Sequence, residues 1–127
     1  MLNQQTTNKN PLFLINSLLK GEVLISEFIQ KLEIKEGFLK NRKIILNNVP
    51  DDERIKNALR SFSTGEEGVL LEINMGTGTS EAYTIEIETE KVSISSDGCA
   101  GVFYAIQTLR QIFEQKEIPC CYYRRQA

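Results

Sequence analysis

The 127-residue sequence contains no histidine and no tryptophan. Without histidine the chain cannot form a Ser-His-Asp or Cys-His nucleophile system, a zinc site with two histidine ligands or the usual proton shuttle near neutral pH. An enzyme built from this chain would depend on carboxylates, lysine, tyrosine or cysteine. The length indicates a single domain, which is large enough to bury a core without the help of disulfides or metals.

Cysteine is scarce, and basic charge is not in excess. Cys99, Cys120 and Cys121 are odd in number and form no Cys-x-x-Cys motif, so we expect no disulfide framework. Free thiols favour a cytoplasmic chain, with a periplasmic or secreted one as the alternative if a leader has been removed. The net charge of −2 gives no electrostatic footprint for nucleic acid, and we predict no nucleic-acid partner.

Long apolar runs are also lacking. The longest run, residues 12–19, includes Asn16 and Ser17 and is too short to cross a bilayer, so we predict no membrane partner. The first ten residues carry no signal-peptide pattern. We expect residues 1–20 to be an N-terminal extension with a short core or interface helix, and residues 21–127 to form one domain.

Six short strands are predicted, and one of them alternates clearly. In residues 83–89, Tyr83, Ile85 and Ile87 share one face and polar side chains share the other, as in a sheet with one dry face. Glu90 separates this run from residues 91–95, which predicts a hairpin. The other predicted strands are 32–35, 43–46, 68–75 and 120–124.

Two amphipathic helices are predicted between these strands. Asp51 is the expected N-cap of the first helix, and Asp97 is the expected cap of the second, over residues 98–115. The apolar stripes are Ile55, Ala58, Leu59 and Phe62 in the first helix and Val102, Ile106, Leu109 and Phe113 in the second. Together these elements predict an α+β two-layer sandwich, in which a mostly antiparallel sheet carries the two main helices on one face.

Two patterns suggest chemistry only weakly. The sequence Gly-Thr-Gly-Thr at residues 76–79 follows a strand like a phosphate loop, but it lacks the Walker lysine, and a polar hairpin connection is the favoured interpretation. Glu86, Glu88 and Glu90 could supply an acid/base pair, although carboxylates on the exposed side of a sheet are usually solvated. We therefore predict no catalytic residue, no cofactor and no metal ligand.

A third pattern is aromatic. Tyr122 and Tyr123 stand beside Arg124 and Arg125, where they could stack on a base or a sugar. The favoured interpretation is a C-terminal edge strand or an interface. Tyr104 lies one position off the apolar stripe of the second helix, which predicts a half-buried contact.

Residues 81–119 resemble the N-terminal, non-catalytic domain of family 20 glycoside hydrolases, the β-N-acetylhexosaminidases. The similarity lies in Tyr83-Thr84-Ile85, in the strand from Val92 to Ile94 and in the helix sequence GVFYAIQTL at residues 101–109. Ala105 departs from the glycine that the family often has, and Ile118-Pro119 matches the usual exit from the helix. Residues 30–37 look like the family's opening strand, so the resemblance spans about residues 25–119.

The resemblance implies an accessory function. In the family this domain packs on a TIM barrel, whose Asp-Glu pair carries the chemistry with the substrate's own acetamido group as the nucleophile. Neither the barrel nor that pair is present in these 127 residues, so the implied role is to pack against and support a catalytic barrel. The residues expected to make interdomain contacts are Tyr104, Gln107, Thr108, Tyr122 and Tyr123.

Two alternatives remain open. The chain could be a free-standing protein-interaction module, in which a second copy of the chain covers the surface that a barrel would otherwise bury. It could also be a weak carbohydrate-binding module that uses Tyr104, Tyr122 or Tyr123. The first alternative predicts a dimer, and the second predicts heat on titration with N-acetylglucosamine or chitin oligomers.

Overall fold

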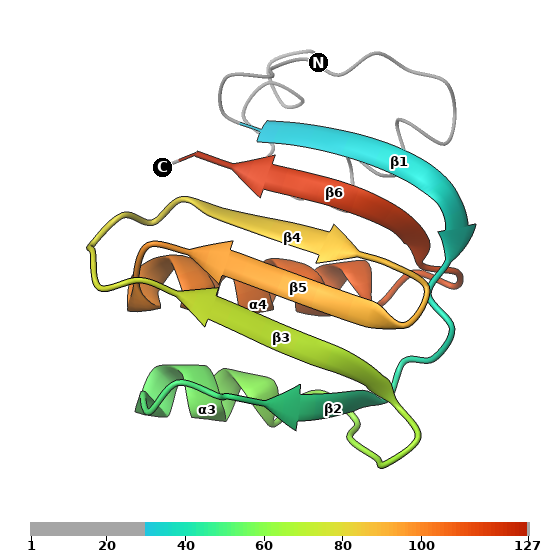
Figure 1. Ribbon diagram of the computed structural model, residues 1–127, viewed down its shortest axis with the longest axis horizontal. Coiled ribbons are helices and arrows are strands. Elements are labelled where there is room, and N and C mark those ends of the chain that lie inside the picture. Colours follow the sequence, from blue (N-terminus) through green and yellow to red (C-terminus); the bar gives the residue numbers. More distant parts are fainter. Residues whose placement is uncertain (1–29, 127) are drawn as a thin grey trace.

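The computed structural model describes residues 30–126, which form one sheet and one layer of helices. The predicted extension over residues 1–20, with its helix at residues 12–19, lies outside the described residues. Figure 1 shows both described helices on the same face of the sheet, with the other face uncovered by any helix of residues 30–126. The helices are α3 (Glu53–Leu59) and α4 (Cys99–Ile112), and the strands are β1 (Gln30–Phe38), β2 (Ile44–Asn47), β3 (Val69–Met75), β4 (Tyr83–Ile87), β5 (Lys91–Ser96) and β6 (Pro119–Arg125).

The strand order is β1-β6-β4-β5-β3-β2, which makes the sheet mixed. The pairs β1–β6, β6–β4 and β4–β5 are antiparallel, whereas β5–β3 and β3–β2 are parallel. A parallel pair needs a crossover, and α3 supplies it between β2 and β3. The predicted α+β sandwich, with antiparallel pairs in the majority and two helices on one face, is confirmed.

Two predictions about connections and edges are wrong. Residues 76–79 do not join a hairpin, because β5 lies between β3 and β4 in the sheet. The C-terminal strand β6 is not an edge strand, because β1 pairs with its outer side and β4 with its inner side. The hairpin predicted from residues 83–95 is confirmed, with Ile85 opposite Ile94 across β4 and β5.

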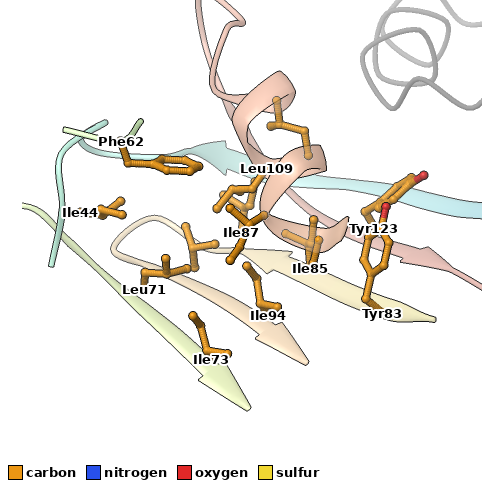
Figure 2. Close-up of a cluster of buried hydrophobic side chains, with 14 of the residues drawn as sticks. Ile44, Phe62, Leu71, Ile73, Tyr83, Ile85, Ile87, Ile94, Leu109 and Tyr123 are labelled. Atoms are coloured by element: carbon orange, nitrogen blue, oxygen red, sulfur yellow. The ribbon is translucent and has the colours of Figure 1, made fainter. Parts of the chain in front are cut away.

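The core lies between the sheet and α4. Ile85, Ile87 and Ile94 on the inner face of the sheet are fully buried, as is Leu109 on α4 (Figure 2). Burying each such side chain contributes about 1.5–3 kcal/mol. The alternation of apolar and polar residues along β4 and β5 is thus what selects the face that the helices cover.

Two buried tyrosines at one end of this core keep their hydroxyl groups satisfied. The Tyr83 hydroxyl lies 2.5 Å from Oγ1 of Thr108 on α4, and the Tyr123 hydroxyl donates to Oε1 of Gln30 at 3.1 Å. Their rings lie beside each other, with centroids 6.1 Å apart (Figure 2). A buried polar group without a partner would destabilise the fold, so both hydrogen bonds stabilise it. Both also link parts of the chain that are distant in the sequence.

Both predicted helix caps are wrong by one residue. The cap of α3 is Asp52, whose carboxylate accepts a hydrogen bond from the Ile55 N–H at 3.1 Å, while Asp51 pairs with Lys56 at 2.7 Å. The backbone hydrogen bond from Ile55 also lowers the pKa of Asp52. Asp51 and Asp52 have the same side chain, so the path of the backbone into the helix decides which of them is the cap.

At α4 the N-cap is Gly98, and no side chain caps this helix. Asp97 lies instead against the β3–β4 connection, where its carbonyl accepts a hydrogen bond from the Gly78 N–H at 2.6 Å. A Cβ atom on Gly78 would come within 1.7 Å of the Asp97 carboxylate. The close passage of these two loops therefore directs Asp97 away from the helix N-terminus.

The C-terminus of α4 is held by a side chain from the β1–β2 connection. The Arg42 guanidinium donates to the backbone carbonyls of Phe113, Gln115 and Lys116. These carbonyls lie at and just beyond the helix end, where the acceptors have no partner within the helix and the dipole favours a cation.

Replacing Arg42 with methionine is expected to lower the free energy of unfolding by about 1–2 kcal/mol, since charged hydrogen bonds contribute about 1.5–3 kcal/mol and this one is exposed. Urea unfolding measures the change. Lys43→Met is the matched control, because it removes a neighbouring exposed cation that donates to none of these carbonyls. Equal losses in the two variants would contradict a helix-capping role for Arg42.

Candidate docking surface

Aromatic and basic side chains gather on the outer side of the helix layer. We call this surface the helix patch and define it as Arg54 from α3 and Phe103, Tyr104, Gln107 and Arg110 from α4. Tyr104 is 44% exposed, and its ring packs edge-to-face on Phe103 with centroids 5.7 Å apart. The Arg54 guanidinium lies 5.2 Å from the centre of the Phe103 ring. Such a cation–π contact is worth about 0.5–1 kcal/mol at an exposed site.

The helical period of α4 determines which of its side chains lie in this patch. Val102, Ile106 and Leu109 point into the sheet and are fully or almost fully buried. Tyr104 and Gln107 are three residues apart and follow the opposite side of the helix, so they are neighbours on its outer surface. The Arg110 guanidinium donates to the Gln107 amide oxygen and extends the patch by one more turn.

Arginine and tyrosine around a partly covered aromatic ring are the residue types enriched in protein interfaces and their hot spots. Arg54 and Arg110 give the patch two positive charges in a chain whose net charge is −2. The surface therefore fits a folded partner with an apolar contact and carboxylates around it. It offers no nucleophile and no general base.

The five residues predicted to make interdomain contacts fall into three places. Tyr104 and Gln107 lie together in the helix patch. Thr108 faces inward and meets the Tyr83 hydroxyl, and Tyr123 is fully buried, so both lie in the interior of this domain rather than on its surface. Tyr122 is partly exposed on the opposite, open face of the sheet, because successive residues of β6 point to opposite sides.

Arg54 belongs to the patch, yet no local pattern in the sequence indicates it. It lies almost fifty residues before Phe103, on a helix whose contact with α4 depends on the whole fold. Phe103 borders the apolar stripe of the second helix. It is only partly buried, because its ring lies between Tyr104 and Arg54 at the border of the core.

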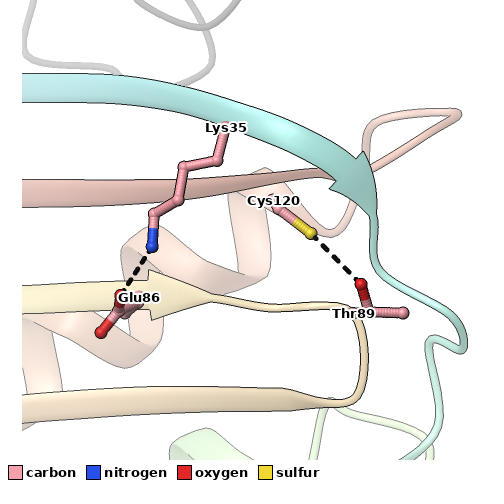
Figure 3. Close-up of polar contacts among 4 residues, drawn as sticks. All are labelled: Lys35, Glu86, Thr89 and Cys120. Atoms are coloured by element: carbon pink, nitrogen blue, oxygen red, sulfur yellow. Dashed lines mark hydrogen bonds and ion pairs between the residues drawn. The ribbon is translucent and has the colours of Figure 1, made fainter.

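The carboxylates considered for acid/base chemistry are held in ion pairs or lie apart. Glu86 accepts from the Lys35 ammonium at 2.6 Å (Figure 3), and this hydrogen bond raises the pKa of Lys35. Glu90 lies 3.8 Å from the Lys40 ammonium. Both ion pairs are exposed to solvent, so Glu86 and Glu90 do not form an acid/base pair in a shared cavity.

The buried thiols are equally unsuited to chemistry at neutral pH. Burial raises the pKa of Cys121 to about 12, so its thiol stays protonated. Cys120 is buried too, and its Sγ atom lies 3.8 Å from the Thr89 hydroxyl (Figure 3). All three cysteines are free thiols.

The Gly-Thr-Gly-Thr loop does not cradle a phosphate. Its Gly76 N–H donates to the Ser96 carbonyl at 2.9 Å, and its Gly78 N–H donates to the Asp97 carbonyl. A phosphate loop needs such N–H groups free to face its ligand. Here they fasten the loop to the connection between β5 and α4.

Within residues 30–126, no three Cys, Asp or Glu side chains come together in a way that could hold a metal ion. None of the helices described in this range has the length and apolar character needed to cross a bilayer.

Comparison with known protein families matches most of the described residues. Residues 29–122 match the family described as glycosyl hydrolase family 20, domain 2. No curated protein sequence matches the chain significantly.

Comparison with solved structures finds the same fold inside larger proteins. A Flavobacterium johnsoniae chitobiase aligns at a TM-score of 0.54 and 16% identity, covering 80% of this chain and 20% of that one. A β-N-acetylhexosaminidase from Bacteroides fragilis aligns at 0.55 and 21%, covering 80% and 24%. An exo-β-N-acetylglucosaminidase from Vibrio harveyi aligns at 0.51 and 18%, covering 75% and 18%. The match thus takes up about a fifth of the length of these proteins.

Proposed function

Because this chain belongs to the family of domain 2 of glycosyl hydrolase family 20, we propose that it is the accessory domain of a β-N-acetylhexosaminidase-like glycoside hydrolase. In this proposal it packs against a catalytic TIM barrel, which is not part of the 127 residues, and supports the barrel's fold. The domain itself contributes no group to the hydrolysis. Its helix patch is the surface that meets the barrel.

The observation that carries the proposal is the helix patch on a domain of this family. Tyr104 is exposed although it sits on a helix whose other side is fully buried, and Arg54 and Arg110 flank it with positive charge. The family match and the large size of the aligned proteins support a partner domain within the same polypeptide. A folded partner that covers Tyr104 would bury an aromatic side chain that this domain leaves in water.

The chain alone is expected to hydrolyse aryl N-acetyl-β-glucosaminides no faster than buffer does. The reason is that its carboxylates are exposed or paired and its Cys121 thiol stays protonated, so no described group can act as a general acid beside a sugar. A chromogenic assay at pH 5–8 with purified chain measures this. Hydrolysis at an enzyme-like rate, co-purifying with the chain, would overturn the proposal.

The docking part of the proposal has its own test. Tyr104→Glu in the natural gene product is expected to lower the yield of soluble hydrolase at least several-fold, because it places a carboxylate in the interface. Ser63→Glu is the matched control, since it adds the same charge at an exposed position outside the helix patch. In the isolated chain Tyr104→Glu should cost no more than about 1.5 kcal/mol, the usual contribution of the edge-to-face contact with Phe103 that it removes.

Two results would count against this use of the helix patch. Equal yields from the Tyr104→Glu and Ser63→Glu proteins would remove the patch from the interface. A dimer of the isolated chain that Tyr104→Glu dissociates would assign the patch to a second copy instead.

A further inference from the structure

Four apolar side chains extend the inner face of the sheet beyond α4. Leu32 of β1 is opposite Tyr123 of β6, and Tyr123 is opposite Ile85 of β4, so all three share the side of the sheet that carries the helices. Ile34 and Cys121 form the next pair on this side. We call Leu32, Ile34, Cys121 and Tyr123 the β6 flank.

The β6 flank is largely buried, although neither described helix packs on its strands. Leu32 is 3% exposed and Tyr123 is 0% exposed. Among the elements of residues 30–126, α4 packs on β3, β4 and β5, and α3 packs on α4 (Figure 1). Because β1 is two strands away from β4, Leu32 lies about 10 Å to the side of β4. Leu32 therefore needs a cover that the two helices do not provide.

Two glutamines beside the flank lack hydrogen-bond partners. Phe103 of α4 faces Arg54 on α3, whereas Thr108 faces β4, the strand next to β6. Gln111 lies one turn after Thr108, and Gln115 lies one turn further, just beyond the helix end. Among the described residues, the buried atoms Gln111 Oε1 and Gln115 Nε2 have no partner. Buried polar atoms are nearly always satisfied, so the cover should offer a donor and an acceptor.

The composition of residues 12–19 matches this requirement. The sequence LFLINSLL is the longest apolar run of the chain, and it lies outside the family match at residues 29–122. Its leucine, isoleucine and phenylalanine side chains suit the apolar floor of the β6 flank. Asn16 and Ser17, in the middle of the run, each offer a donor and an acceptor to the two glutamines.

The chain can reach the β6 flank without crossing the domain. β1 begins at Gln30, whose side chain accepts a hydrogen bond from the Tyr123 hydroxyl at 3.1 Å. Residues 20–29 join the apolar run to this point, and a linker of that length spans at most about 33–36 Å. β1 itself is about 30 Å long, since a strand rises about 3.3 Å per residue. The linker is therefore long enough for the run to lie anywhere along the flank.

We propose that residues 12–19 pack as a short helix on the β6 flank, beside α4. The apolar side chains of this helix cover Leu32 and Tyr123, and its polar pair lies against Gln111 and Gln115. This assignment goes beyond the docking function proposed above and does not depend on it. The helix patch stays open to a partner domain, whereas the β6 flank is closed by the chain itself.

NMR of the complete 127-residue chain tests the contact. Nuclear Overhauser effects are expected between the methyl groups of residues 12–19 and both the Leu32 methyl groups and the Tyr123 ring. An equimolar mixture of isotope-labelled and unlabelled chains shows whether these effects arise within one chain. Effects that arise between chains would assign the cover to a second copy, and their complete absence would leave the flank open to a partner domain. Either result overturns the proposal.

Thiol labelling at pH 8 tests the cover by a second route. Cys121 lies on the β6 flank, and its neighbour Cys120 points to the other face of β6, so the two thiols report on opposite sides of one strand. Replacing both Leu14 and Ile15 with aspartate is expected to raise the labelling rate of Cys121 at least tenfold and that of Cys120 less than twofold. Mass spectrometry of the digested chain locates the label.

The matched control replaces both Thr6 and Thr7 with aspartate, which adds the same charge to the same end of the chain but outside the apolar run. It should change neither labelling rate by more than twofold. A Cys121 rate that is the same in the two double variants would overturn the proposal. Equal rises of Cys120 and Cys121 would mark general unfolding rather than removal of a cover, and would contradict it as well.

Discussion

Valine in place of Gly101 is expected to lower the free energy of unfolding by about 3 kcal/mol, at the upper end of the usual cost of overpacking a core. Gly101 lies in the first turns of α4, where the helix runs closest to the sheet. A Cβ atom built on it would lie 1.9 Å from the Ser96 hydroxyl and 2.6 Å from the Ala82 carbonyl oxygen. The second contact is with backbone, so rotating a side chain cannot relieve it, and the helix would have to move.

Urea unfolding of Gly101→Val and Ala100→Val separates this effect from helix propensity. Ala100 is the preceding residue of the same helix and is only partly buried, so valine there should cost about 0.5 kcal/mol. Moving α4 would also weaken the hydrogen bond between Thr108 and Tyr83. Similar losses in the two variants would show that α4 does not depend on a close approach at Gly101.

The domain is expected to lose about 3–5 kcal/mol of stability between pH 9 and pH 11. Burial raises the pKa of Cys121 from 9.0 to about 12, and it raises the pKa values of Tyr83 and Tyr123 as well. In this range the unfolded chain releases protons that the folded chain keeps. The unfolded state therefore binds fewer protons, and stability falls as pH rises, by up to about 1.4 kcal/mol per pH unit for each group.

Urea unfolding under reducing conditions at pH 7, 9, 10 and 11 measures this loss. Cys121→Val keeps an apolar side chain at the site and removes the first group to titrate, so it should flatten the curve between pH 9 and pH 10. The two tyrosines should still lower its stability above pH 10. A wild-type stability that stays constant up to pH 11 would contradict the burial of these three groups.

Much of the fold could be predicted from the sequence, because its signals are local. The alternation of apolar and polar residues at 83–89, with only Glu90 before the next strand, predicted the β4–β5 hairpin. The 3.6-residue period from Val102 to Leu109 predicted the side of α4 that faces the sheet. The lack of a side chain at Gly101 also allows the close approach of α4 to the sheet.

The pairing of distant strands could not be predicted in the same way. Nothing within residues 119–125 indicates that β1, almost ninety residues earlier, pairs with the outer side of β6. For this reason β6 was expected at the edge of the sheet, and residues 76–79 were expected to close a hairpin. Both errors concern register and order between strands, which depend on the whole core rather than on any one run.

The helix patch was half predictable. Tyr104 and Gln107 follow from the helix period, since they fall outside the apolar stripe. Arg54 depends on how α3 packs on α4, and the inward turn of Thr108 and Tyr123 depends on their partners Tyr83 and Gln30.

The most direct test of the proposed accessory role is the size of the polypeptide that carries this domain in its own organism. An antibody raised against residues 30–126 would detect it in a whole-cell lysate separated under denaturing conditions. A single band several times larger than a chain of 127 residues is expected. A band at the size of 127 residues alone, with none larger, would contradict a domain that supports a catalytic barrel in the same polypeptide.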